Sequence, residues 1–536
     1  MPTRNIVFVA YQDQPNIGIG YMANVLIGHG FNVELLDIRN DNQMILKRIL
    51  ELDPIIVGLS IIFQNFTPDF ADLVGYLRHH GVRCVICAGG HTPSLEPDET
   101  LLYIPGLDFI VRFEGEFTLL EISQRLDKGQ EWKDVKSIAW RSNGLIFKTP
   151  LRPLIKDLDR LPFPKRWSLD YQCLGVKVTS LLASRGCPRD CTFCSIRRFY
   201  SAPPGKVRRT RSPENVIDEM RMLYDDHNVR IFLFQDDDFS LMTQRDLAWS
   251  RSFIECLHKE GIADRILWKI NCRSDEVKFD IFNELHSAGL YMVYLGIESG
   301  NDTGLKMLNK HISVEQNLQA VEILKRIGLS YDFGFMLFDP SSTIELVLEN
   351  VRFLKKICGD GSATVSFGKT LPYAGTDLED HMRQENRLCG DRWATDYKFL
   401  DHQTEDWFGY LCGVFYPWVF GGQSLQAQLR WAKFEIDVLK KFYPNTMGLN
   451  EHLERIRFLA HWYNEILSRV IEDSAEIVLF SDSHHTCALE SIQAAAEEQR
   501  QWLEDELALQ RQSFYTDAGF PLELVLGEQY SAVADG

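Results

Sequence analysis

The sequence contains two series of short apolar runs that alternate with helical spans, and this alternation limits the fold more than any other feature. In the first series, the runs expected to be strands stand at Asn5–Ala10, Asn32–Leu36, Ile55–Ser60, Val82–Ala88 and Phe109–Val111. Strands that alternate with helices form a parallel sheet covered by helices. The sequence therefore predicts an α/β chain in which residues 1–150 form a doubly wound, Rossmann-like parallel sheet.

The second series begins after a proline-rich connection. Four prolines stand between Thr149 and Arg166, and such a stretch is typical of a linker, which we place at residues 151–170. Strands are then expected at Lys177–Ala183, Arg230–Gln235, Leu267–Asn271, Tyr291–Gly296, Leu329–Met336 and Thr364–Thr370. Six strand–helix units predict a partial (β/α)6 TIM-like barrel over residues 171–380, with its site at the carboxyl ends of the strands.

The remainder of the chain, residues 381–536, reads as a mostly helical region that is rich in aromatic side chains. Trp407, Trp418 and Trp431 belong to this group. Aromatic residues at such density usually form a core. A lid over a substrate pocket is the alternative, because the specificity of a shared barrel has to come from residues outside it.

Three cysteines stand close together in the stretch Ala183–Phe199, at Cys187, Cys191 and Cys194. Cysteine thiolates hold iron–sulfur clusters, and three of them leave one iron of a four-iron cluster open to another ligand. Zinc is the alternative, but it requires a fourth Cys or His at short spacing, and residues 195–205 contain neither. The motif therefore predicts a cluster with one open iron.

The loops of the first series are the expected ligand site of its sheet. They are Gln14–Gly20, Ser60–Phe66, Ala88–Ser94 and Phe113–Glu116. Ligands of doubly wound sheets bind at the carboxyl ends of the strands, and glycine in these loops allows the backbone to approach a ligand closely. The first loop lacks the spacing G-x-G-x-x-G, which disfavours a nicotinamide cofactor.

Polar residues follow three strands of the second series. Asp236 and Asp237 come after the second strand, and the alternative to a ligand role is a helix N-cap followed by a solvated turn. Arg273 follows the third strand, where it could bind a carboxylate or pair with the two aspartates. Glu298 and Ser299 follow the fourth strand within the stretch LGIESG.

These motifs carry a resemblance to a known family. The spacing C-x3-C-x2-C with Phe193 before the third cysteine, together with G-I-E-S-G, resembles the radical S-adenosylmethionine (SAM) superfamily. The order P-x-x-I-G-I-G-Y, V-G-L-S, A-G-G-H and E-G-E over residues 1–150 resembles the cobalamin-binding domain fused ahead of many such enzymes. The chain thus resembles the class B, methyltransferase-like members, and the resemblance covers about two thirds of it.

The resemblance implies three cofactors: a 4Fe-4S cluster, SAM and cobalamin. It implies that Cys187, Cys191 and Cys194 ligate the cluster and that SAM is bound near Phe193, Asp236, Asp237, Arg273, Glu298 and Ser299. The implied cobalamin contacts are Asn16, Gly18, Gly20, Ser60, Gly89, Gly90, His91, Glu114 and Gly115. A histidine ligand to cobalt is not predicted, because the motif D-x-H-x-x-G is absent. His91 alone could equally be a loop histidine that bonds backbone.

The function implied by the resemblance is C-methylation by a cobalamin-dependent radical SAM enzyme. Reductive cleavage of SAM would give a 5′-deoxyadenosyl radical, and methylcobalamin would supply the methyl group to a carbon of a small molecule or peptide. One alternative is ring formation, ring contraction or oxidation without net methyl transfer. Another is a non-catalytic regulator that binds the same cofactors. No residue is assigned as catalytic, and the motifs do not identify the substrate.

Charge and hydropathy narrow the partners. The net charge is −18, from 57 basic and 75 acidic residues, whereas non-specific binding of nucleic acid requires a basic surface. No apolar run reaches the length of a membrane span, and the N-terminus lacks a signal sequence. We therefore expect a cytoplasmic protein that binds neither nucleic acid nor membrane. The resemblance to radical SAM enzymes further implies an electron donor such as flavodoxin or ferredoxin.

Overall fold

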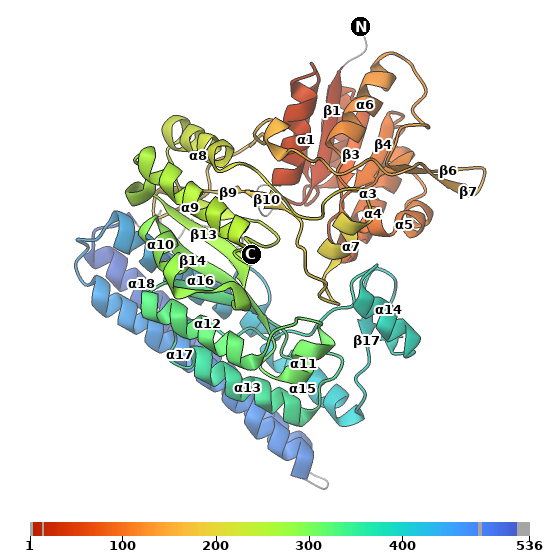
Figure 1. Ribbon diagram of the computed structural model, residues 1–536. Coiled ribbons are helices and arrows are strands. Elements are labelled where there is room, and N and C mark those ends of the chain that lie inside the picture. The colour runs from red at the N-terminus through yellow and green to blue at the C-terminus, as the bar shows by residue number, and fades with distance from the viewer. Residues whose placement is uncertain (1–3, 13–15, 481–484, 522–536) are drawn as a thin grey trace. The chain divides into compact units, whose positions relative to one another are not determined.

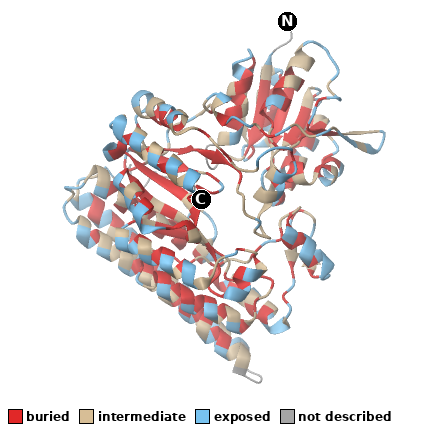
Figure 2. Cartoon of the chain, in the orientation of Figure 1, coloured by how far each residue is buried: buried red, intermediate tan, exposed pale blue. Residues whose placement is uncertain are grey.

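The computed structural model describes residues 4–12, 16–480 and 485–521, which form two compact units (Figure 1). Unit 1 contains residues 1–168, 184–215 and 371–397, and unit 2 contains residues 169–183, 216–370 and 398–536. Each unit is built on one sheet whose strands are mostly buried, while the helices around it are buried on one side (Figure 2). None of the helices in these described ranges is long and apolar enough to cross a membrane.

The sheet of unit 1 has the order β2-β1-β3-β4-β5-β6-β7. The first five strands in this order are parallel to one another, whereas β6 is antiparallel to both of its neighbours, β5 and β7. This confirms the predicted doubly wound sheet. The strands are β1 (Asn5–Ala10), β2 (Asn32–Asp37), β3 (Ile56–Ser60), β4 (Val85–Gly89), β5 (Phe109–Val111), β6 (Ile138–Ser142) and β7 (Leu145–Lys148).

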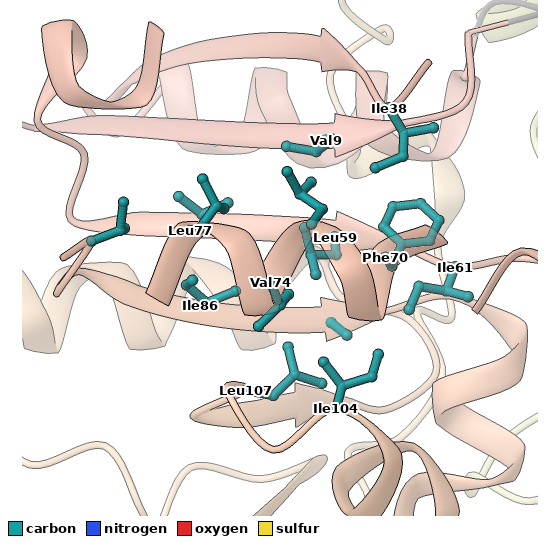
Figure 3. Packing of buried hydrophobic residues seen from close by; sticks show 14 of the residues in the cluster. Val9, Ile38, Leu59, Ile61, Phe70, Val74, Leu77, Ile86, Ile104 and Leu107 are labelled. Atoms are coloured by element: carbon teal, nitrogen blue, oxygen red, sulfur yellow. The ribbon is translucent and has the colours of Figure 1, made fainter. Parts of the chain in front are cut away.

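Helices cover this sheet. They are α1 (Ile17–Ile27), α2 (Asn42–Leu52), α3 (Thr67–His79), α4 (His91–Leu95), α5 (Pro97–Tyr103) and α6 (Glu116–Asp127). One face of the sheet packs against α3, where Phe70, Val74 and Leu77 meet side chains such as Val9 and Leu59 of the strands (Figure 3). Side chains on a strand alternate between the two faces, so these residues belong to a single buried layer.

Two further segments complete unit 1. The segment 184–215 contains β10 (Ser184–Arg185), α7 (Ser195–Ser201), β11 (Arg209–Thr210) and the first residues of α8 (Pro213–His227). The segment 371–397 contains α14 (Asp377–Gln384), β16 (Leu388–Cys389) and β17 (Asp396–Tyr397). The amide of Leu378 donates to the carbonyl of Thr192 (2.9 Å), so the second segment packs against the first.

The sheet of unit 2 has the order β15-β14-β13-β12-β9-β8. Its strands are β8 (Gln172–Cys173), β9 (Val176–Leu181), β12 (Val229–Phe234), β13 (Leu267–Arg273), β14 (Leu290–Glu298) and β15 (Ser330–Phe335). All pairs are parallel except β8 with β9. The partial barrel is confirmed, but its sixth predicted strand, Thr364–Thr370, is wrong: that stretch forms only an isolated bridge between Phe338 and Lys369.

The helices of unit 2 follow the strands as predicted and continue through the C-terminal region. They are α9 (Gln244–Lys259), α10 (Phe279–Ser287), α11 (Asp302–Met307), α12 (Val314–Ile327), α13 (Ile344–Cys358), α15 (His402–Val419), α16 (Leu425–Phe442), α17 (Leu449–Phe480) and α18 (His485–Asp517). Local sequence fixes their ends: Ser313 begins α12 with a capping box, and Gly328 ends it in a left-handed conformation.

The aromatic residues of the C-terminal region mainly form a core. Trp407, Trp418 and Trp431 are all buried, while Tyr416 and Phe420 are exposed. Trp431 lies in a cluster that joins α16 and α18 to strands β9, β12 and β13. The long helices α17 and α18 lie side by side (Figure 1). Burial of the three tryptophans favours the core over the lid as their role.

Candidate functional site

The first predicted cofactor loop is shorter than the sequence indicates, because α1 already begins at Ile17. The side chain of Asn16 caps the helix by accepting a hydrogen bond from the amide of Ile19 (3.0 Å). Gly18 and Gly20 therefore lie in α1, which corrects their placement in a loop. Gln14 lies outside the described residues.

Gly20 has a structural reason to lack a side chain. A Cβ atom at this position would come within 2.6 Å of the carbonyl oxygen of Lys165 in the linker. The amide of Lys165 also donates to the carbonyl of Gly20 (2.9 Å). Close packing of the linker on α1 thus accounts for this glycine, and its contact with cobalamin stays a prediction.

The loops after β3 and β4 lie next to each other at the carboxyl edge of the sheet, because Ser60 pairs with Gly89 in register. Gly90 follows with a φ of +107°, and a Cβ atom there would overlap the carbonyl oxygen of Ile61. Only glycine fits this backbone at low cost. Close packing of the two loops thus accounts for this glycine, and its contact with cobalamin stays a prediction.

His91 begins α4 and packs against the segment that follows the cysteines. Its ring stacks on Phe199 of α7, with ring centroids 4.2 Å apart and an interplanar angle of 9°. Its Nδ1 atom lies 3.4 Å from the hydroxyl oxygen of Ser195. Burial lowers the pKa of His91 to about 4, so the imidazole is neutral at physiological pH. The imidazole thus contacts the side chains of Phe199 and Ser195 rather than the backbone.

Glu114 is held by the protein through both of its oxygens. They accept hydrogen bonds from Arg209 (2.8 Å and 3.0 Å), from Arg185 (3.2 Å) and from the amide of Ile155 (2.7 Å). Gly115 follows as the N-cap of α6. Since Arg185 and Arg209 lie in β10 and β11, Glu114 connects the loop after β5 to the strands that flank the cysteine loop.

The cysteine loop is closed at its base by the pairing of β10 with β11. Gly186 has a φ of +82° just before the first cysteine, and a Cβ atom there would overlap the carbonyl oxygen of Val207. The turn that starts the loop therefore requires glycine. Phe193 is half-buried in this loop.

The three thiols are all partly exposed. The amide of Cys194 donates to the carbonyl of Cys191 (3.2 Å), which forms a tight turn between these two residues. Within the described ranges, no three His, Cys, Asp or Glu side chains are grouped so as to hold a metal ion. The loop offers the correct number and kind of ligand atoms, and the ligation of a cluster by Cys187, Cys191 and Cys194 stays a prediction.

The sheet of unit 2 has two chemically different faces. The outer face is apolar, and Trp268 of β13 packs there against Phe253 of α9 with ring centroids 5.5 Å apart. The inner face carries Lys269, Tyr294 and Asp332 in adjacent strands, since these residues alternate with apolar ones and Tyr294 pairs with Asp332 in register. Helix α16 faces this side, because its Arg430 forms an ion pair with Asp332 (2.7 Å).

Two predicted SAM contacts lie at the carboxyl ends of β12 and β13. Asp236 is 1% exposed and accepts a hydrogen bond from the amide of Ala183 (3.0 Å), the last residue of unit 2 before the cysteine loop. Arg273 is also buried, and its Nε donates to Asp275 (2.9 Å). Asp275 lies two residues further along the chain, and the two roles considered for Arg273, binding a ligand carboxylate and pairing with Asp236 and Asp237, stay predictions.

Glu298 ends β14 in a left-handed conformation, with a φ of +67° that residues other than glycine rarely adopt. Its carboxylate accepts a hydrogen bond from Lys310 (2.9 Å), and both side chains are mostly buried. A Cβ atom at Gly296 or Gly334 would come within about 3 Å of this carboxylate. The two glycines thus leave the space in which the Glu298 carboxylate lies over the inner face, and strained backbone of this kind is frequent at ligand sites.

The remaining two SAM candidates, Asp237 and Ser299, have different surroundings, and their contact with SAM stays a prediction. Asp237 is exposed, and the helix after it is capped by Thr243 rather than by an aspartate of this turn. Ser299 is fully buried, and its hydroxyl donates to the side chain of Asn350 (3.3 Å). Ser299 therefore belongs to a structural network beneath the strand end, and the structure does not bring it to the inner face.

Judged by their chemistry, the residues fit the three implied cofactors. The cysteine loop supplies three thiolates for an iron–sulfur cluster. Glu298 supplies an acceptor for the hydroxyl or ammonium groups of SAM at a strand end of the partial barrel. The loops after β3 and β4 lie at the carboxyl edge of the other sheet, which is where doubly wound sheets bind their ligands.

Comparison with known protein families agrees with both sites. Residues 3–123 match the family model of the B12 binding domain, and residues 181–354 match that of the radical SAM superfamily. The chain belongs to the cobalamin-dependent radical SAM enzymes. These matches confirm the three cofactors and the enzyme class expected from the sequence, whereas the residues that hold each cofactor stay predictions.

Individual relatives cover most of the chain. An uncharacterized methyltransferase, PH0819 of Pyrococcus horikoshii, is 29% identical over 389 residues, which are 71% of this chain and 81% of the relative. The anaerobic magnesium-protoporphyrin IX monomethyl ester cyclase of Rubrivivax gelatinosus is 28% identical over 64% of this chain and 62% of its own length. The solved structure of the cobalamin-dependent radical SAM enzyme OxsB with aqua-cobalamin and SAM bound has a TM-score of 0.67 at 17% identity, covering 99% of this chain and 84% of that one.

Sequence reasoning missed the polar group on the inner face of unit 2. Lys269, Tyr294 and Asp332 all lie within strands that were identified by their apolar character. The signal was a charged or hydroxylated residue inside a strand expected to be buried, as in the run Trp268-Lys269-Ile270. Arg430 could not be connected to them, because nothing in the sequence indicates which helix faces the sheet.

Proposed function

We propose that this enzyme transfers a methyl group from SAM, through cobalamin, to a carbon atom of a small-molecule or peptide substrate. The observation that carries the proposal is the combination of the two domains with a relative named as a methyltransferase that aligns over 71% of the chain. When bound, the reduced cluster supplies the electron that cleaves SAM, and cobalamin relays the methyl group.

The residues of the chain would serve this reaction by binding and orientation. Cys187, Cys191 and Cys194 would ligate the cluster, and electrons would come from a small donor protein such as flavodoxin or ferredoxin. Glu298, fixed by Lys310 at 2.9 Å, would accept hydrogen bonds from SAM. Its burial makes such bonds stronger than at an exposed site. Gly90 and its neighbours would face cobalamin.

The test uses SAM with a deuterated methyl group and the reconstituted, reduced enzyme under anaerobic conditions. A product that gains the deuterated methyl group, together with S-adenosylhomocysteine, is expected. The Cys191→Ala variant serves as the control and should give neither. Substrate consumption that yields 5′-deoxyadenosine without any S-adenosylhomocysteine or labelled product would contradict methyl transfer.

A second candidate is oxidative ring formation without net methyl transfer. The similarity to the magnesium-protoporphyrin IX monomethyl ester cyclase favours it, although this chain covers only 62% of that relative. In the same labelling experiment, this reaction would give a product that has lost hydrogen and carries no deuterium. The two candidates are therefore separated by the mass of one product.

A further inference from the structure

A single lysine on the inner face of unit 2 is buried without a partner for its charge. Lys269 is 3% exposed. Its Nζ lies 5.4 Å from the ring centroid of Tyr294, which stands one level nearer the carboxyl ends of the strands because Tyr294 pairs with Asn271. Among the described residues, its ammonium makes no hydrogen bond or ion pair. Buried charges are normally paired with an opposite charge and hydrogen-bonded, and within the part of the chain that the structure describes the ammonium of Lys269 is neither.

The charges around Lys269 do not balance. Asp332 and Arg430 are the charged residues that influence it. They already pair with each other, with Nε and Oδ2 2.7 Å apart. Two positive groups therefore face one negative group, and one positive charge is left over. Desolvation also lowers the pKa of Lys269 to about 8, so the ammonium is still the main form at neutral pH.

The inner face next to Lys269 is not sealed. Met292, Tyr294 and Gly296 of β14 are partly exposed, whereas the residues between them, on the outer face, are buried. Ser330 and Gly334 of β15 are partly exposed as well. Among the described residues, no hydrogen bond is made by the hydroxyl of Tyr294, which lies 3.4 Å from the position of a Cβ atom on Gly334.

We propose that Lys269 is the anion-binding residue of the substrate site and that the substrate carries a carboxylate, which pairs with this ammonium on the inner face of the partial barrel. Tyr294 is the neighbouring donor, and its ring directs the lysine side chain toward the strand ends. Glu298 lies further along the same face, so a carboxylate on Lys269 would leave the rest of the substrate extending toward the predicted SAM site.

A carboxylate fits better than a phosphate monoester. The surplus on the inner face is a single positive charge, which a monoanion neutralises and a dianion would reverse. The inference rests on the proposed function only because it takes the ligand to be the substrate of that reaction. Binding of the carboxylate itself requires no turnover.

The experiment measures binding to the full chain loaded with cobalamin and cluster. A panel of small monocarboxylates, including acetate, propionate and benzoate, is compared with the matching primary amides and with methyl phosphate at constant ionic strength. The readout is the thermal shift of wild type and of Lys269→Met. At least one carboxylate should stabilise the wild type, its amide should not, and the apparent affinity should fall at least tenfold in Lys269→Met.

Two controls make the result specific. Lys325→Met removes another lysine of unit 2, whose ammonium pairs with Asp360 (2.9 Å), and it should bind the carboxylates like the wild type. SAM titrated alone should bind wild type and Lys269→Met equally. The proposal would be overturned if the wild type bound no carboxylate, bound the amides equally well or preferred methyl phosphate. It would also be overturned if Lys269→Met bound the carboxylates as well as the wild type does, or if this variant lost affinity for SAM. Failure of methyl transfer would leave these binding results unchanged.

Discussion

Replacing Lys269 by methionine should make the protein more stable, although it should weaken substrate binding. Burial lowers the pKa of Lys269 from its ordinary 10.5 to about 8. A tenfold change in an acid dissociation constant corresponds to ~1.4 kcal/mol. Keeping the ammonium charged at neutral pH therefore costs about 3 kcal/mol of the free energy of unfolding. Methionine has a similar length and carries no charge. The loss of the contact with Tyr294 offsets up to about 1 kcal/mol, which leaves a gain of about 2 kcal/mol.

The pH dependence gives this prediction a definite sign. Because the folded pKa lies below the unfolded one, the unfolded chain binds more protons between pH 8 and pH 10.5. The cost of Lys269 is complete below pH 8 and disappears as the pH rises to 10.5. The advantage of Lys269→Met should therefore be largest near neutral pH and should shrink at high pH.

The assay is urea unfolding of wild type and Lys269→Met, followed by circular dichroism at neutral pH and at about pH 10. The difference between the two proteins removes the contributions of other titrating groups. A variant that is less stable than wild type at neutral pH, or a difference that does not change with pH, would show that the ammonium is compensated within the protein, and the reasoning about Lys269 would fail.

Three further substitutions test other parts of the structure. Glu114→Gln removes a buried carboxylate that holds two arginines, and should cost about 3 kcal/mol of stability in urea unfolding. Gly90→Ala should cost at least ~1 kcal/mol because of its φ of +107° and the carbonyl oxygen it would meet, whereas Gly81→Ala, with a similar φ in open space, should cost less; equal losses would contradict the steric argument. Trp407→Ala should lower stability by about 3–5 kcal/mol while ligand binding is retained, and weakened binding with unchanged stability would instead favour the lid.

The sequence was sufficient for the fold because the two series of strands have strong local signals. Strands β1 and β5 have the predicted bounds, and the other predicted strands that form differ by a few residues. The sixth barrel strand failed because the apolar run Thr364–Thr370 finds no neighbouring strand to pair along its length. Short elements such as β10 and β11 depend on contacts with distant residues, among them Glu114. No local sequence pattern therefore predicts these two strands.

The candidate site was predictable where a motif fixes the chemistry and less so where partners matter. The cysteines stand out by their spacing and Glu298 by the resemblance of its stretch to a family motif, and their cofactor contacts stay predictions. The buried hydroxyl of Ser299 bonds to Asn350, which lies on a helix far along the chain, and no local pattern in the sequence indicates that contact. The role proposed for Lys269 depends on distant partners in the same way. Its position in the sequence gives no sign of that role, which follows only from the arrangement of β14, β15 and α16.

The central claim is that this chain binds a redox-active cluster through its three-cysteine loop and uses it to cleave SAM. The most direct measurement is the release of 5′-deoxyadenosine from SAM by the anaerobically reconstituted and reduced protein, without added substrate. We predict that the wild type releases 5′-deoxyadenosine and that Cys191→Ala does not, while both retain the absorption bands of bound cobalamin. Equal release by both proteins, or no release by a wild type that carries a full iron–sulfur cluster, would contradict the account.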